Sequence, residues 1–127
     1  MKSFLLVLSL LVIAACSSKK DTIADTHETT AQLTHKFSNG EAYLIDVRTP
    51  EEFQEGHLKY ASNVNFKSSE FKNIIGKLDK NKPVYLYCKK GNRSKKATDT
   101  LNTLGFTKAY NIGGLEELKA SGLEVEQ

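Results

Sequence analysis

One cysteine and the charged turn that follows it have the clearest potential for chemistry in this chain. Cys88 ends an apolar and aromatic run, residues 84–88, and leads through two lysines and a glycine into a segment of helical character, residues 94–104. A buried strand that passes through a tight turn into a helix directs backbone N–H groups and the positive end of the helix dipole at one small space. Such a space lowers the pKa of a thiol, and the resulting thiolate is a nucleophile.

The alternative for Cys88 is a buried, unreactive cysteine at a strand end. The residues that follow it are charged, polar or glycine, so the thiol is expected to face solvent. Gly91 adopts backbone conformations that other residues reach only with strain, which suits a tight turn. We therefore interpret Cys88 as the reactive residue of the chain.

Short apolar runs alternate along the chain with segments whose apolar residues repeat at helical spacing. We expect strands at residues 42–47, 61–66, 84–88 and 109–112, and helices at residues 28–37, 49–53, 68–78, 94–104 and 115–120. In the third helix, Phe71, Ile74, Ile75 and Leu78 should share one face, while Gly113 and Gly114 should break the chain after the last strand. The alternation predicts an α/β fold with a parallel sheet, whose ligands bind at the carboxyl ends of the strands, where Cys88 lies.

Length and composition restrict the function. A chain of 127 residues forms one domain, and its formal charge of +3 is spread without an aromatic-interleaved basic face, so nucleic acid is not an expected partner. Cys16 and Cys88 are the only cysteines, which excludes a disulfide framework. No metal and no organic cofactor are expected.

The N-terminus has the pattern of a targeting segment. A positive start precedes an apolar run at residues 4–15, which is of signal-peptide length. Residues 13–16, Ile-Ala-Ala-Cys, resemble the lipobox of bacterial lipoproteins, which implies cleavage before Cys16 and lipidation of that cysteine. The alternative is an ordinary secretory signal, or a retained anchor, with an incidental cysteine. We expect a signal peptide at residues 1–15, a lipid anchor and flexible linker at residues 16–28, and one domain at residues 29–127.

Four segments in order make the chain similar to a single-domain rhodanese. They are residues 44–48 (Leu-Ile-Asp-Val-Arg), residues 51–58 with Glu-Glu-Phe and Gly-His-Leu, residues 87–94 around Cys88, and residues 111–115 (Asn-Ile-Gly-Gly-Leu). The resemblance covers roughly residues 29–126. It implies a three-layer α/β domain with a small parallel sheet of about five strands and helices on both faces.

The resemblance implies sulfur transfer. In that family the loop cysteine takes a sulfane sulfur from a donor such as thiosulfate, becomes a persulfide and passes the sulfur to an acceptor. Cys88 matches that cysteine, and the substrate-binding residues would be those that follow it, Lys89, Lys90, Gly91, Asn92, Arg93 and Ser94. Loop amides and Ser94 would hold the outer sulfur, and the basic side chains would attract an anionic donor, unless they form only a solvated turn. Arg93 is the stronger candidate for function or for bracing the loop.

Other polar residues are assigned a supporting role. Asp46, Arg48, Glu52 and His57 have the chemistry of acids and bases, but the resemblance implies that such residues mostly brace the strand ends and loops around the site. An ionised thiol needs no general base. The chain departs from the family pattern at two places outside the Cys88 turn. Family members often carry proline and glycine where this chain has Lys59-Tyr60, and an aromatic residue is common where it has Leu118.

We therefore expect a rhodanese-type sulfurtransferase that moves sulfur from thiosulfate or polysulfide to a thiol, cyanide or protein acceptor. The alternative from another class is a non-catalytic module that binds or senses sulfur. A phosphatase or arsenate reductase is disfavoured, because those relatives resemble a Cys-x5-Arg pattern and only four residues separate Cys88 from Arg93. The chain is expected to be a monomer outside the cytoplasm, held through its lipid anchor alone on a bacterial membrane, in the periplasm or at the cell surface.

Overall fold

The computed structural model describes residues 22–23 and 26–127. The expected signal peptide, Cys16 and most of the linker lie outside the described residues. Within those residues, no helix is both long enough and apolar enough to cross a membrane.

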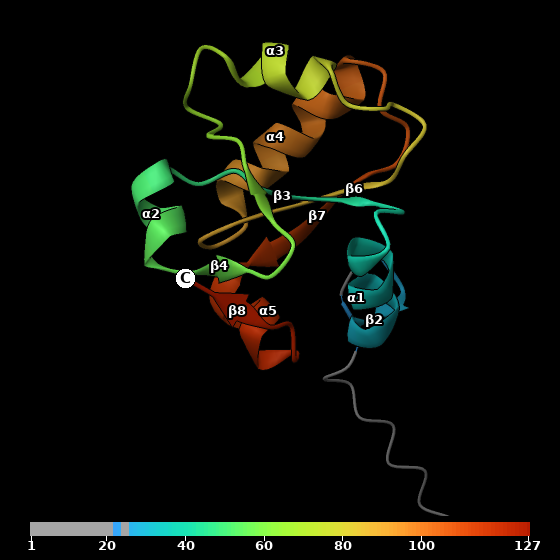
Figure 1. The fold of residues 1–127 in the computed structure, drawn as a ribbon. Coiled ribbons are helices and arrows are strands. Elements are labelled where there is room, and N and C mark those ends of the chain that lie inside the picture. The colour runs from blue at the N-terminus through green and yellow to red at the C-terminus, as the bar shows by residue number, and fades with distance from the viewer. Residues whose placement is uncertain (1–21, 24–25) are drawn as a thin grey trace, which may run out of the picture.

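A parallel four-stranded sheet forms the centre of the domain (Figure 1). Its strands, in spatial order, are β5 (Ser62–Asn63), β3 (Tyr43–Asp46), β6 (Val84–Cys88) and β7 (Ala109–Gly114). All five residues of β6 are buried, as expected for a central strand that is covered on both faces. The α/β class is confirmed.

The described part of the sheet has four strands, where about five were expected. The remaining short strands pair antiparallel with one another in two separate sheets. These pairs are β1 (Thr22–Ile23) with β2 (Glu28–Thr29), and β4 (His57–Leu58) with β8 (Val125–Glu126). Each of these strands has only two residues, and neither pair hydrogen-bonds to the main sheet.

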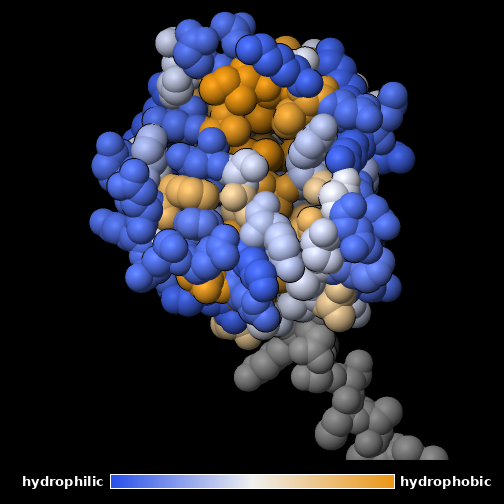
Figure 2. Space-filling view, viewed as in Figure 1, coloured by the Kyte–Doolittle hydropathy of each residue, from blue (hydrophilic) through white to orange (hydrophobic). Residues whose placement is uncertain are grey.

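Helices cover both faces of the sheet. Alternate residues of β6 point to opposite faces, so each set packs against a different layer of helices. Tyr85 and Tyr87 belong to a core cluster with residues of α1 (Thr30–Ser38) and α5 (Leu115–Ala120). Val84, Leu86 and Cys88 belong to a second cluster with residues of α3 (Phe71–Gly76) and α4 (Asn92–Thr103). Figure 1 shows these two helical layers above and below the strands, and Figure 2 shows hydrophobic residues gathered in the region of α3 and α4. The three-layer prediction is confirmed.

Local sequence signals set several helix starts. The helix α2 (Pro50–Glu55) begins after Thr49, whose side chain accepts a hydrogen bond from the Glu52 N–H while the Glu52 carboxylate accepts from the Thr49 N–H. This capping box, with proline at the first helical position, satisfies backbone groups that a helix start leaves unpaired. The Thr29 side chain forms the same arrangement with Gln32 at the start of α1.

Three predictions for individual segments were wrong. The helix α3 begins at Phe71 instead of residue 68, and its six residues bury Phe71 and Ile75 but leave Ile74 44% exposed. The strand expected at residues 61–66 is a strand only over β5, although the backbone N–H groups of Val64 and Phe66 still donate to the carbonyl oxygens of Asp46 and Val47. The strand β7 does not end at residue 112 but continues through Gly113 and Gly114, which pair with Tyr87 and Cys88 after one extra residue in β7 shifts the register.

Candidate active site

The strand β6 delivers Cys88 to the carboxyl edge of the sheet. Cys88 is only 1% exposed, so the expectation of a thiol that faces open solvent was wrong. The side chain instead lines a pocket of about 150 Å³ together with Lys89, Lys90, Asn92 and Arg93. Burial follows from the alternation along β6, which turns Cys88 toward α4, and access is confined to the loop side.

The loop after Cys88 closes around the sulfur. Gly91 has a φ of +95° and directly precedes α4 without a side-chain cap. Its backbone N–H donates a hydrogen bond to Cys88 Sγ over 3.0 Å. Because α4 has 12 residues, the positive end of its dipole adds to this donor at the sulfur.

The two glycines of β7 make room for this loop. A Cβ atom on Gly114 would lie 2.5 Å from the Lys89 carbonyl oxygen and 3.0 Å from the Lys90 Cα, distances that only a glycine allows. A Cβ atom on Gly91 would in turn lie 3.4 Å from the Gly113 Cα. Gly113 and Gly114 were expected to break the chain after the last strand, whereas they allow the loop backbone to pack against β7.

Two opposing influences act on the ionisation of Cys88. Burial is the largest influence and disfavours the thiolate. The Ser94 hydroxyl and the backbone N–H groups of Ser94, Lys90 and Gly91 favour it, and together they lower the pKa of the Cys88 thiol below its ordinary value. The site therefore stabilises an anionic sulfur mainly with neutral donors.

Ser94 and Asn111 form the inner wall of the site. The Ser94 side chain is fully buried, and its Oγ lies 3.4 Å from Cys88 Sγ and 2.7 Å from Asn111 Oδ1. Asn111 was not among the site residues predicted from the sequence. The signal was its place near the end of a strand beside β6, two residues before the glycine pair, since neighbouring parallel strands end at the same edge.

Arg93 braces the loop against α2. Its two terminal nitrogens donate to the Glu52 carboxylate over 2.7 and 3.0 Å, a bidentate ion pair. The hydrogen bond from Arg93 lowers the pKa of Glu52 to about 2, opposed by burial and assisted by Thr49. Lys89 and Lys90 are exposed and form no ion pair with any residue that the structure describes, so they are the cations left to meet an anion.

Asp46 and Arg48 tie the end of β3 to the end of α2. Arg48 Nη2 donates over 2.7 Å both to Asp46 Oδ2 and to the Gly56 carbonyl oxygen, and Asp46 also accepts from the Arg48 backbone N–H. Asp46 is fully buried and Arg48 is 5% exposed. Through these contacts both residues hold β3 against α2, and their supporting role at the site stays a prediction.

His57 contacts α2 and β8. Its ring stacks on Phe53 with centroids 3.7 Å apart, and Nδ1 donates to the Phe53 carbonyl oxygen over 2.9 Å. Its Nε2 lies 3.5 Å from the Glu126 carboxylate. Both ring nitrogens therefore face groups outside the Cys88 loop, which fits a bracing residue.

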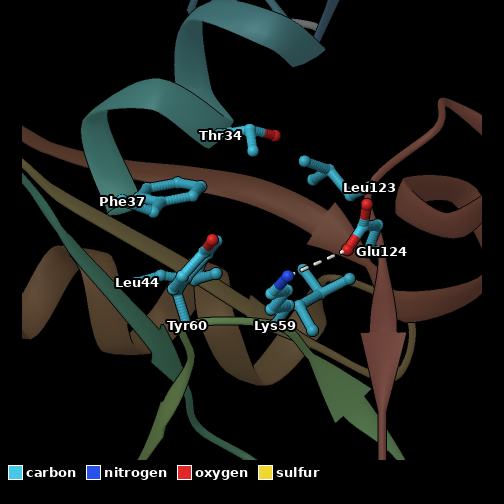
Figure 3. Close-up of a pocket in the computed structure, with 8 residues that line it drawn as sticks. Thr34, Phe37, Leu44, Lys59, Tyr60, Leu123 and Glu124 are labelled. Carbon is cyan, nitrogen blue, oxygen red and sulfur yellow. Dashed lines mark hydrogen bonds and ion pairs between the residues drawn. The ribbon is translucent and has the colours of Figure 1, made fainter. Parts of the chain in front are cut away.

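A second hollow lies between α1 and the turns beside β4 and β8 (Figure 3). Lys59 and Tyr60, the departures noted in the sequence, line it, and Lys59 Nζ contacts Glu124 over 3.3 Å. Its volume of about 10 Å³ is at most that of one water molecule, so it holds no substrate. Tyr60 has a φ of +72°, which is strained for an aromatic residue. No group of acidic, histidine or cysteine side chains suited to a metal ion occurs among residues 22–23 and 26–127.

Comparisons with known proteins identify relatives. Residues 29–121 match the family model of the rhodanese-like domain. The chain is 36% identical over 76 residues to the thiosulfate sulfurtransferase PspE of Escherichia coli, covering 60% of this chain and 73% of PspE. It is 44% identical over 73 residues to the protein YqhL of Bacillus subtilis, covering 58% of this chain and only 56% of YqhL. The solved structure of a rhodanese with anions from E. coli matches with a TM-score of 0.59 at 31% identity, over 68% of this chain and 98% of that one.

Proposed function

The chain belongs to the rhodanese-like family, and from this premise we propose that it is a sulfurtransferase that carries a sulfane sulfur on Cys88. The observation that carries the proposal is the position of Cys88 Sγ, buried at the end of β6 and 3.0 Å from the Gly91 N–H nitrogen, on the wall of a small basic pocket. Relatives named as thiosulfate sulfurtransferases support the same class of reaction.

In the first step the Cys88 thiolate attacks the outer sulfur of thiosulfate. A new S–S bond forms to Cys88, the S–S bond of thiosulfate breaks, and sulfite leaves with the electron pair. Charge is conserved, since a thiolate and a thiosulfate dianion become a persulfide anion and a sulfite dianion. A polysulfide donor would react in the same way, with a shorter polysulfide as the leaving group.

In the second step a thiophilic acceptor attacks the outer sulfur of the persulfide. The S–S bond to Cys88 breaks and the thiolate is regenerated, so that a thiolate acceptor becomes a persulfide and cyanide becomes thiocyanate. The negative charge alternates between Cys88 Sγ and the outer sulfur. Loop N–H groups that already favour an anionic sulfur at Cys88 are placed to stabilise both forms.

The charged residues of the pocket have different roles in this proposal. Lys89 and Lys90 are exposed at its rim and attract the dianionic donor and stabilise departing sulfite. Arg93 lines the pocket as well, but its guanidinium is bound by Glu52, so it mainly holds the loop in shape.

The rival function is a module that binds or senses sulfur without turnover. Intact mass spectrometry of the purified chain after incubation with thiosulfate or polysulfide separates the two functions. We expect a gain of one sulfur atom that cyanide removes and that the Cys88→Ser variant does not show. No adduct from either donor, or an adduct that persists in the variant, would contradict the proposal.

We further propose that the domain works outside the cytoplasm on a lipid anchor at Cys16. The support is the lipobox-like sequence at residues 13–16. Growth of a bacterium that expresses the full chain with a radiolabelled fatty acid should label the native protein but not a Cys16→Ala variant. Equal label in both, or label in neither, would contradict this location.

A further inference from the structure

The Ser94 hydroxyl lies between two acceptors but has a single hydrogen. Its Oγ is 2.7 Å from Asn111 Oδ1 and 3.4 Å from Cys88 Sγ. A hydroxyl donates one hydrogen bond at a time. The two acceptors therefore compete for the same hydrogen in a site where Ser94 is fully buried.

The orientation of the Asn111 amide follows from its other neighbours. The backbone N–H of Gly113 can only donate, and it lies 3.1 Å from Oδ1. The carbonyl oxygen of Gly91 can only accept, and it lies 3.1 Å from Nδ2. The oxygen that faces Ser94 is thus the amide carbonyl, and Ser94 must donate to it.

This geometry describes the site with a neutral thiol. The Ser94 hydrogen is held by Asn111, and the lone pairs of Oγ are left to accept from the Cys88 S–H. When the thiol releases its proton to solvent, the sulfur becomes the stronger acceptor and the hydroxyl must turn toward it. That rotation breaks the Ser94–Asn111 hydrogen bond.

We propose that Asn111 is a positioning residue that competes with the Cys88 sulfur for the Ser94 hydrogen and thereby limits how readily Cys88 ionises. Asn111 holds the hydroxyl while the sulfur is neutral and releases it when the sulfur is anionic. This inference deepens the proposed function, because both the thiolate and the persulfide anion need the released hydroxyl.

Other charged groups also act on the sulfur. Those that face it or pair with residues at the site come from the loop, from α4, from α2, from the end of β3 and from α5. They are Lys89, Lys90, Arg93, Glu52, Asp46, Arg48 and Glu117. None of them changes in the variants below, so their influence cancels from the comparison.

The test is the pH dependence of iodoacetamide alkylation, quantified by mass spectrometry on the peptide that contains Cys88. Asn111→Ala should move the alkylation midpoint down by about one pH unit, because the hydroxyl then has only the sulfur as acceptor. Asn111→Asp should move it up, since a carboxylate holds the hydrogen more strongly and adds negative charge. General loosening of the loop would move both variants in the same direction.

The same changes in a Ser94→Ala background show whether Asn111 acts through Ser94. We expect Asn111→Ala to have no effect there and the rise from Asn111→Asp to be smaller. If Asn111→Ala does not fold, the Asn111→Asp pair alone carries this comparison. Equal shifts in the two backgrounds, shifts of the same sign, or no shift would overturn the proposal.

A matched control is Asn63→Ala. The Asn63 amide donates to the backbone oxygens of Asp46 and Arg48 and contacts neither Ser94 nor Cys88 by hydrogen bond. It should lower the unfolding temperature without moving the midpoint. Because alkylation requires no sulfur donor, failure of sulfur transfer and failure of this inference are distinguishable.

Discussion

The Cys88 loop and the turn after β4 each contain a residue in the left-handed region, but they place different residue types there. The Cys88 loop has Gly91 at a φ of +95°, and the turn after β4 has Tyr60 at +72°. Glycine adopts this conformation without steric cost, whereas a bulky residue is strained. Gly91 packs against Gly113 inside the candidate site, while Tyr60 is 43% exposed beside a hollow too small for a substrate.

The difference shows in which turn the backbone conformation affects the candidate site. In the Cys88 loop the backbone N–H of Gly91 is itself a ligand of the sulfur, and a shift of a few tenths of an ångström weakens that hydrogen bond. In the Tyr60 turn the backbone only connects β4 to β5, so strain there affects stability and not the site. Four substitutions, from the largest expected effect to the smallest, test this contrast.

Gly114→Ala should have the largest effect. Its Cβ would meet the Lys89 backbone at 2.5 Å, so the loop must move away from β7. We expect destabilisation by about 1–3 kcal/mol, as for other overpacked sites, and loss of the sulfur adduct on Cys88. Chemical denaturation and intact mass measure the two effects. If the Gly114→Ala variant takes up sulfur as readily as the wild type, the close approach of β7 to the loop is not needed for sulfur loading.

Gly91→Ala should have the next largest effect. Alanine at a φ of +95° is strained by about 1–2 kcal/mol, and its Cβ would contact Gly113 at 3.4 Å. The sulfur loses a well-placed donor, so the alkylation midpoint of Cys88 should rise. Alkylation over a pH series, with Gly40→Ala as a matched left-handed position outside the site, measures the change. An equal midpoint in both variants would show that the conformation at Gly91 has no special effect on the sulfur.

Glu52→Gln should cost about 1–2 kcal/mol of stability at neutral pH, because Arg93 loses its bidentate partner. The folded-state pKa of Glu52, about 2, lies below the unfolded value near 4.5. The ion pair therefore stabilises the fold fully above about pH 4.5, and this contribution is lost as the pH falls toward 2. Urea unfolding of native and variant chains across this range should converge at low pH. A difference that stays constant with pH would contradict the assignment.

Tyr60→Gly should have the smallest effect. Relief of the strained φ and the greater flexibility of glycine in the unfolded chain oppose each other, and we expect a gain of at most about 1 kcal/mol. Sulfur loading and the Cys88 alkylation profile should stay at wild-type values. Thermal unfolding and the mass assay measure both properties, and a loss of sulfur loading would connect this turn to the site.

Much of the fold and part of the site were predictable from local sequence. The alternation of apolar strands with amphipathic helices predicted the α/β class, and the pattern Thr-Pro-Glu-Glu predicted the start of α2. Cys88 and the loop to Ser94 were identified from residue type and order. These features are local, because strand, turn and cap preferences act over a few neighbouring residues.

The extent of the sheet and the exposure of side chains were less predictable. Ile74 fits a helical face by spacing, but the short helix α3 leaves it in solvent. Cys88 precedes charged residues, and yet β6 turns it toward the core side of α4. Both outcomes depend on which elements pack above a residue, and sequence spacing does not contain that information.

The sequence by itself determined the fold class, the cysteine that is the candidate nucleophile and the glycine that turns the loop. Only the tertiary structure decided that Asn111 faces Ser94, that Glu52 holds Arg93, and that Gly114 makes room for the Lys89 backbone. These partners are 17, 41 and 25 residues apart in the chain. They meet because β6 and β7 lie side by side and α2 ends near the same edge of the sheet, and such contacts exist only once the strands have paired.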